Sequence, residues 1–157
     1  MAVKANHDIS SGLDTAFINS AINSNLAYRP EFVSNDYTQG KKVSVAIERE
    51  LRHCDAFYIS VAFITEGGLA PLKQVLAELR DKGIPGKILT TSYLTFTEPK
   101  ALKTLADLSN VEVRVYDSTD EGASGFHTKG YIFKEEEIYR FIVGSSNMTA
   151  SAFSVNK

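Results

Sequence analysis

The chain has 157 residues, of which 43% are hydrophobic and 23% charged, and a formal net charge of −2. This mix is typical of one globular domain that buries its own core, and the near-neutral charge gives no global sign of a nucleic-acid partner, although a local cleft can still be basic. The single cysteine, Cys54, excludes an internal disulfide, and no apolar stretch approaches the roughly 18 residues of a membrane span. We therefore expect a cytoplasmic protein.

The N-terminal third predicts a helix, a connector and a second helix. Residues 8–22 carry apolar side chains at helical spacing behind Asp8 as a cap, and the segment around Pro30 reads as irregular. Residues 41–54, "KKVSVAIERELRHC", repeat apolar positions with a charged outer face. We place a boundary after residue 40, which separates an N-terminal helix and connector (1–40) from one domain over 41–157.

Strand and helix patterns then alternate. Residues 55–65, "DAFYISVAFIT", are aromatic and β-branched with almost no charge, which predicts a strand buried on both faces in a central sheet. Two helices and two strands follow, over residues 69–83 (ending at Gly83), 84–94, 97–110 (opened by Thr97, Glu98 and Pro99) and 111–117. This order predicts an α/β fold with a largely parallel sheet, right-handed crossovers and helices outside.

The last third predicts a loop and a hairpin. Residues 118–125 are loop-like, and the strand-like runs "FHTKGYIF" (126–133) and "EIYRFIVG" (137–144) flank the charged turn "KEEE". The polar cluster "GSSN" (144–147) leads into "MTASAF", which predicts the first turn of a helix. The hairpin would return "GSSN" beside the start of "FHTKG".

This juxtaposition predicts an anion pocket. On a strand His127 and Lys129 would share a face, with Cα atoms roughly 6.5–7 Å apart, so that one phosphate can touch both side chains. Gly144 permits close approach, Ser145 and Ser146 supply hydroxyl and amide donors, and Asn147 supplies an amide. A helix starting there would add its dipole. A His-x-Lys pair alone is common and "GSSN" alone is usually a turn or cap, but the combination is much rarer.

Other candidates have ordinary explanations. We expect no role for His7, a capping role for His53 at a helix end, and a buried apolar role for Cys54. Polar residues near the predicted strand ends could line a substrate groove or could be ordinary strand and loop residues: Ser60, Thr65, Thr90, Thr91 and Tyr93. Four lysines, Lys41, Lys42, Lys100 and Lys103, are equally compatible with nucleic-acid contacts and with solvated helix faces.

"HTK" at 127–129 followed by "GSSN" at 144–147 resembles the HKD signature of the phospholipase D superfamily, H-x-K-x4-D and then G-[GS]-x-N. Together with "CDAFYISVAFITEGGLAPL", "GKILTTSYLTFTEPKAL" and "VEVRVYD", the chain from about residue 28 onward resembles the phospholipase D-like domain found N-terminal to bacterial superfamily II DEAD/DEAH-box helicases. The resemblance implies a mixed, largely parallel sheet flanked by helices, with a C-terminal hairpin carrying the His-x-Lys motif. It also implies that 41–157 holds a single HKD copy cut from a longer helicase-containing protein.

The same resemblance implies a mechanism without metal or other cofactor. His127 would be the nucleophile, forming a phosphohistidine, or the acid, with a second histidine from another HKD copy in the other role. Lys129 and Asn147 would bind the non-bridging phosphate oxygens, with Ser145, Ser146 and Gly144 completing the phosphate site. Lys134 stands where the motif has aspartate, and the interval before Gly144 is longer than the standard one. Glu135, Glu136 or Glu137 could replace the aspartate, although a solvated turn suits all three better.

We therefore expect a phosphodiesterase, in particular an endonuclease acting on DNA, as a module of a helicase protein. The alternative is a catalytically weak module for nucleic-acid binding or dimerisation. A single motif predicts a C2 homodimer with the site at the seam, unless the remainder of a longer protein supplies the second motif. A lipid substrate is disfavoured because no apolar membrane-binding segment stands out, and no ATP-binding motif occurs in the chain.

Overall fold

The computed structural model describes residues 31–36, 38–117 and 126–154. The chain divides into two compact units, Met1–Ser34 and Asn35–Lys157, and every element below belongs to the second unit. The helix predicted over 8–22 and the loop predicted over 118–125 lie outside the described residues. The boundary predicted after residue 40 stays a prediction.

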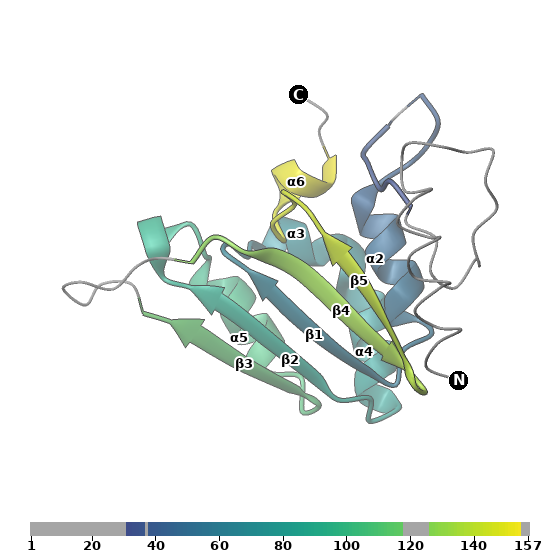
Figure 1. Ribbon diagram of the computed structural model, residues 1–157. Helices are drawn as coiled ribbons and strands as arrows, with labels where there is room; N and C mark the ends of the chain where they lie inside the picture. The colour runs from purple at the N-terminus through teal and green to yellow at the C-terminus, as the bar shows by residue number, and fades with distance from the viewer. Residues whose placement is uncertain (1–30, 37, 118–125, 155–157) are drawn as a thin grey trace, which may run out of the picture. The chain divides into compact units, whose positions relative to one another are not determined.

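A five-stranded mixed sheet organises this unit, in the order β3-β2-β1-β4-β5 (Figure 1). The strands are β1 (Ala56–Val61), β2 (Gly86–Thr91), β3 (Val111–Tyr116), β4 (Lys129–Glu135) and β5 (Ile138–Val143). The β1–β2 and β2–β3 pairings are parallel, whereas β1–β4 and β4–β5 are antiparallel. The expectation of a largely parallel sheet is not met, because the β4–β5 hairpin adds its two antiparallel pairings beside β1.

The helical segments follow the predicted order. They are α2 (Val43–Leu51), α3 (Glu66–Leu69), η2 (Ala70–Leu72), α4 (Lys73–Asp81), η3 (Tyr93–Thr95), α5 (Pro99–Ala106) and α6 (Ala150–Ser154). The helix predicted over 69–83 is confirmed from Lys73 onward, but Pro71 lies in the 3₁₀ turn that precedes it. Gly83, with φ of +70°, ends this helix as predicted, and its N–H donates to Arg80 O. Along the described ranges no helix is long and apolar enough to cross a membrane.

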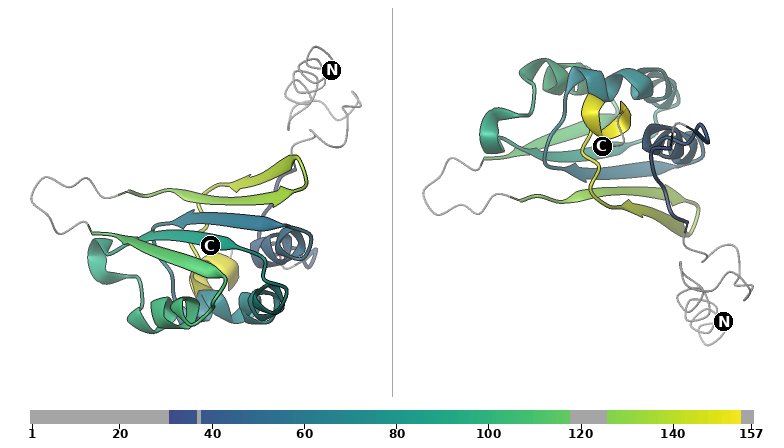
Figure 2. Two further views of the ribbon diagram at one scale, coloured as in Figure 1. Left: turned by 90° about the horizontal axis from the view of Figure 1, so that it is seen from below. Right: turned by 90° about the horizontal axis from the view of Figure 1, so that it is seen from above.

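The described helices lie on one face of the sheet, and the other face carries none (Figure 2). Phe57, Ile59 and Val61 of β1 are buried on the helix side. Tyr58, on the opposite face, is 37% exposed, and its neighbour on that face, Ser60, is half-buried. The prediction that this strand is buried on both faces is therefore wrong, because its aromatic and β-branched composition did not reveal that Tyr58 would stay partly exposed on the face where none of the described helices lies.

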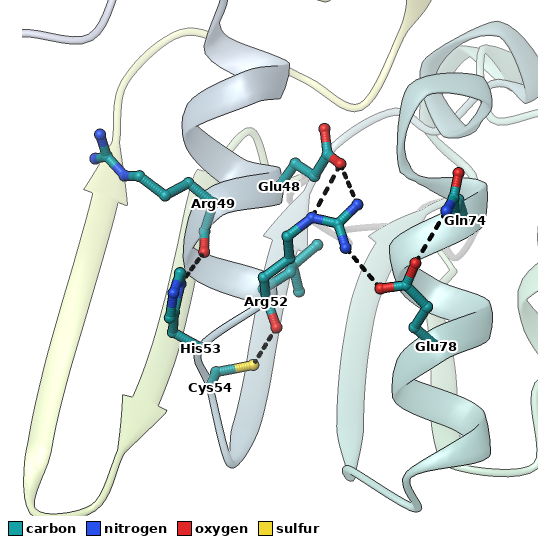
Figure 3. A network of polar contacts seen from close by, with 8 residues as sticks. Glu48, Arg49, Arg52, His53, Cys54, Gln74 and Glu78 are labelled. Atoms are coloured by element: carbon teal, nitrogen blue, oxygen red, sulfur yellow. Dashed lines mark hydrogen bonds and ion pairs between the residues drawn. The ribbon is translucent and has the colours of Figure 1, made fainter.

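Helices α2 and α4 pack against each other and the sheet. Arg52 at the end of α2 contacts Glu48 of the same helix and Glu78 of α4, each at 2.6 Å (Figure 3). Exposed ion pairs of this kind contribute about 0–1 kcal/mol, so the apolar core beneath them supplies most of the stability. Its buried members on these helices and on η2 are Val43, Ile47, Leu51, Leu72, Val75, Leu76 and Leu79.

A close backbone contact joins α3 to the segment after β5. An ideal Cβ built on Gly68 would lie 2.1 Å from Met148 O, so only glycine fits. Met148 forms an isolated parallel bridge with Ile64. The glycine therefore lets the loop after β1 and the segment after β5 approach each other directly.

We predict that Gly68→Ala lowers the free energy of unfolding by about 1–3 kcal/mol, because the added methyl must displace a backbone carbonyl. Urea unfolding followed by circular dichroism measures the change. Gly130→Ala is the matched control, since a Cβ there meets nothing within 4 Å. Equal stability of the two variants would contradict the contact.

Candidate active site

The loop after β1 is hydrogen-bonded to the segment after β5. Phe63 N donates to Asn147 Oδ1 at 3.2 Å. The backbone adds Met148 N to Phe63 O at 3.1 Å and Thr65 N to Met148 O at 3.0 Å. Because a backbone N–H can only donate, the first contact identifies the Asn147 atom facing Phe63 as oxygen. The Nδ2 group of Asn147 thus keeps its two hydrogens for another acceptor.

The His-x-Lys motif straddles the start of the hairpin. Lys129 is the first residue of β4, and His127 lies two residues before the strand with its side chain exposed. Thr128 holds this segment in place, because its carbonyl accepts from Ala62 N at 3.1 Å and its hydroxyl contacts Ser60 Oγ at 2.7 Å. The motif is therefore anchored to the end of β1 through the residue between its histidine and its lysine.

Four of the predicted site residues meet around Phe63 and the start of β4. The His127 ring packs edge-on against the Phe63 ring, with centroids 5.7 Å apart. Lys129 Nζ donates to His127 O at 2.8 Å, and Gly144 N donates to Lys129 O at 3.2 Å. Since Asn147 contacts the Phe63 backbone, the structure brings together His127, Lys129, Gly144 and Asn147, and their chemical roles stay predictions.

The two serines between Gly144 and Asn147 differ in environment. Ser146 is half-buried and its carbonyl accepts from Tyr131 Oη at 3.0 Å, while Ser145 is exposed. Burial raises the pKa of Tyr131 well above its usual range, so its hydroxyl remains a donor. This bond uses the backbone carbonyl of Ser146 and leaves the Ser146 hydroxyl outside it.

The predicted contribution of a helix dipole required a helix to begin at "GSSN". The structure has no helix there. Helix α6 starts at Ala150, and Thr149 Oγ1 accepts from Ala152 N at 3.2 Å. Five residues make too short a helix for an appreciable dipole. The donors of this segment are therefore individual amide and hydroxyl groups.

Among the predicted site residues, Lys129 is the cation, and its pKa differs from the ordinary value of a lysine. Burial lowers the pKa of Lys129, because partial removal from water disfavours the ammonium form. A bound anion would restore a partner for this charge. Within the described ranges no three His, Cys, Asp or Glu side chains group as metal ligands.

A family model described as "Cardiolipin synthase, PLD-like domain" matches residues 50–157. The chain belongs to the phospholipase D-like family. The matched range contains both halves of the motif, His127 with Lys129 and "GSSN". No curated protein matches the chain. Membership in the phospholipase D-like family indicates a phosphodiesterase-type enzyme, whereas the substrate is a separate question.

The departure from the phospholipase D-like motif at Lys134 lies far from His127. Lys134 is five residues beyond Lys129 on β4, which corresponds to about 17 Å and to the opposite face of the sheet. It pairs with Ala56 at the other end of β1. A side chain at this position therefore cannot contact a phosphate bound at His127.

The acidic residues after Lys134 belong to the far end of the hairpin. Glu135 contacts Arg140 at 3.5 Å, and Glu136 N donates to Asp55 Oδ2 at 2.7 Å. Glu136 and Glu137 form the exposed turn between β4 and β5. These positions fit the solvated turn that the sequence favoured, and whether one of the three carboxylates takes the structural place of the motif aspartate stays a prediction.

His53 and Cys54 have structural roles. His53 Nδ1 donates to Arg49 O at 2.8 Å, which confirms the predicted cap at the end of α2 (Figure 3). Cys54 is buried with Sγ 3.3 Å from Leu51 O, and burial raises the pKa of its thiol to about 11. Such a thiol is unreactive at neutral pH. His7 lies outside the described residues.

Most polar residues at the strand ends serve the fold. Thr90 and Thr91 are fully buried, and Thr90 Oγ1 donates to Ala62 O at 3.1 Å. Thr65 Oγ1 accepts from Gly68 N at 3.1 Å and caps α3. Of the suggested groove residues, Tyr93 is the most exposed, at 40%.

Two aromatic residues of the site escaped the sequence analysis. Phe63 contacts His127, and the Phe96 ring packs edge-on against Phe63 with centroids 5.1 Å apart. In the sequence both look like ordinary apolar residues of strand and loop. The available signal was their position just after successive parallel strands, where ligand crevices form.

We predict that sulfate, a fully ionised phosphate mimic, binds the wild type less tightly as the pH rises toward the lowered pKa of Lys129, because the ammonium is lost there. Lys129→Arg should retain sulfate binding to higher pH, since guanidinium stays protonated. Calorimetric titration across the alkaline range measures this, with Lys103→Arg on exposed α5 as control. The same alkaline loss in Lys129→Arg would exclude Lys129 as the anion's cation.

Proposed function

We propose that this chain is a metal-independent phosphodiesterase that cleaves DNA, with His127 as nucleophile or general acid. The observation that carries the proposal is the meeting of His127, Lys129 and Asn147 around Phe63. A histidine, a cation and an amide donor in one place are the groups that phosphoryl transfer needs. Exposure of His127 leaves its ring accessible to a polymer.

The chemistry can be written with these groups. The neutral imidazole of His127 attacks phosphorus, a P–N bond forms and the P–O bond to the leaving nucleotide breaks. A second, protonated histidine gives its proton to the leaving oxygen, then takes one from the water that hydrolyses the phosphohistidine. Lys129 and Asn147 Nδ2 stabilise the negative charge on the non-bridging oxygens.

"GSSN" would complete the phosphate site from the other side. The Gly144 N–H already donates to Lys129 O, so Gly144 would contribute space rather than a hydrogen bond. A Cβ on it would meet nothing within 4 Å. Ser145 is exposed and Ser146 half-buried, and we assign to them the further donors to phosphate.

The second histidine would come from a second copy of the chain. Residues 50–157 hold one His-x-Lys motif, and two copies about a two-fold axis would place two His127 side chains face to face. We propose a C2 homodimer on this ground. The resemblance to domains that precede bacterial helicases supports a role as a DNA-cleaving module of a helicase protein.

Two other functions are alternatives that the experiments below distinguish from DNA cleavage. One is a catalytically weak module that binds nucleic acid or dimerises. The aspartate missing at Lys134 favours this alternative only weakly, because position 134 lies about 17 Å from Lys129. The other is phospholipid cleavage, which the family description "Cardiolipin synthase" favours.

We predict that the wild type cleaves single- or double-stranded DNA in excess EDTA and that His127→Ala abolishes this cleavage, because the attacking imidazole is gone. His53→Ala is the control, since that histidine caps α2. Equal residual cleavage in wild type and His127→Ala would sink the nuclease. Intact DNA with a mobility shift would favour the binding module, and cleavage of phosphatidylglycerol vesicles alone would favour the lipid enzyme.

We also predict that co-refolding wild type with a threefold excess of His127→Ala lowers the DNA cleavage per wild-type chain to about a quarter. This is the chance that a wild-type chain finds a wild-type partner when both histidines are needed. Cleavage that stays proportional to wild-type chain, or a strictly monomeric species by sedimentation at high concentration, would contradict the shared site.

A further inference from the structure

Aromatic side chains extend from His127 to the surface. Phe63 packs against His127 with one edge contact and against Phe96 with another, at centroid distances of 5.7 and 5.1 Å. Phe96 is 58% exposed. A flat apolar ring is therefore presented to solvent one aromatic residue away from the candidate nucleophile.

The loop that carries Phe96 adopts an unusual backbone. Leu94 and Thr95 have φ of 53° and 54°, which is the left-handed region that a β-branched residue such as threonine rarely adopts. Strain of this kind persists only where the surroundings hold it, and it gathers at functional sites. Leu94, like Phe96, projects outward, with 56% of its surface exposed. The apolar side chains of Leu94 and Phe96 are thus exposed on a segment with a strained backbone.

Both ends of this loop are fastened to the sheet. At the start, Tyr93 N donates to Thr91 Oγ1 at 3.1 Å. At the end, Thr97 Oγ1 donates to Thr91 O at 3.0 Å, and Glu98 N donates to Ile64 O at 2.9 Å. These hydrogen bonds fix both ends of the loop that exposes Tyr93, Leu94 and Phe96.

We propose that Phe96, assisted by Tyr93, is a stacking platform for an unpaired nucleobase next to the phosphate bound at His127. This rests on the proposed function, and it adds a preference for single-stranded over double-stranded DNA. In a duplex the bases are stacked on one another, whereas in a single strand a base is free to stack on an aromatic ring. A polar phosphate site joined to an apolar ring matches one nucleotide unit.

Charge favours this ligand over a membrane surface. Loops that insert into membranes usually combine apolar residues with lysine or arginine, which are attracted to anionic lipid. Residues 88–99 contain neither. Asp117 accepts from Ser92 Oγ at the base of the loop, at 3.1 Å. Lys100 follows this range on α5, whereas Lys129 belongs to the candidate phosphate site and is linked to Phe96 through His127 and Phe63.

Direct binding separates the platform from catalysis. Fluorescence anisotropy of the full chain uses DNA with a nuclease-resistant phosphorothioate backbone, because EDTA would not stop a metal-independent nuclease. It compares a single-stranded decamer, the same backbone with abasic sites, and the duplex, each checked for integrity after the measurement. We expect Phe96→Ala to weaken binding of the base-bearing single strand about tenfold and to leave abasic binding unchanged. Phe141→Ala, at a 63% exposed aromatic of β5, is the matched control and should change neither. Wild type should bind the single strand more tightly than the duplex.

Three results for Phe96→Ala would overturn the platform. The first is unchanged affinity for the base-bearing strand, and the second is an equal loss of affinity for base-bearing and abasic strands. The third is unchanged DNA affinity together with lost binding to phosphatidylglycerol vesicles. Phe96→Leu provides a second test, because it keeps apolar bulk without an aromatic face; stacking predicts the same direction of loss as alanine, and membrane insertion predicts none. Base-dependent binding without any cleavage would sink the nuclease and keep the platform. Cleavage without base dependence would do the reverse.

Discussion

The hydrogen bonds between Phe63–Thr65 and Asn147–Met148 connect the fold to the candidate site. They join the end of β1, at the centre of the sheet, to the chain leaving β5 at its edge. Without this connection the "GSSN" segment would be an ordinary loop beyond a hairpin. With it, the amide of Asn147 is oriented by the Phe63 backbone while the Phe63 ring supports His127. The absence of a side chain on Gly68 is what lets the two segments approach each other.

This arrangement would allow a chain with little net charge to hold a phosphate site, as we propose. One partly buried lysine, an oriented amide, an exposed Ser145 and a half-buried Ser146 would form a local anion site that the overall charge of −2 does not reveal. The motif aspartate is not part of this group, because position 134 lies at the far end of β4. We infer that replacing this aspartate with lysine affects the structure at the end of the hairpin and leaves the chemistry at His127 unchanged.

Much of this architecture was predictable, and the failures have physical causes. Helix α5 with Pro99 and the Gly83 cap follow local signals that do not depend on distant contacts. The open face of β1 was not predictable, because Tyr58 and Ser60 look the same in a covered and an uncovered sheet. The proximity of "GSSN" to His127 and Lys129 was predictable, because a hairpin brings its two ends together and the family motif contains both parts. The contacts of Phe63 and Phe96 depend on loop geometry, which the periodicity of apolar residues does not reveal.

The central claim is that His127, Lys129 and residues 145–147 form one anion pocket. A titration of the isotopically labelled chain with sulfate, followed by nuclear magnetic resonance, tests this most directly. The account predicts that the His127 ring, the Ser145 and Ser146 amides and the Asn147 Nδ2 group shift together with a single dissociation constant. Shifts at His127 without any at residues 145–147, or saturation at clearly different sulfate concentrations, would contradict it.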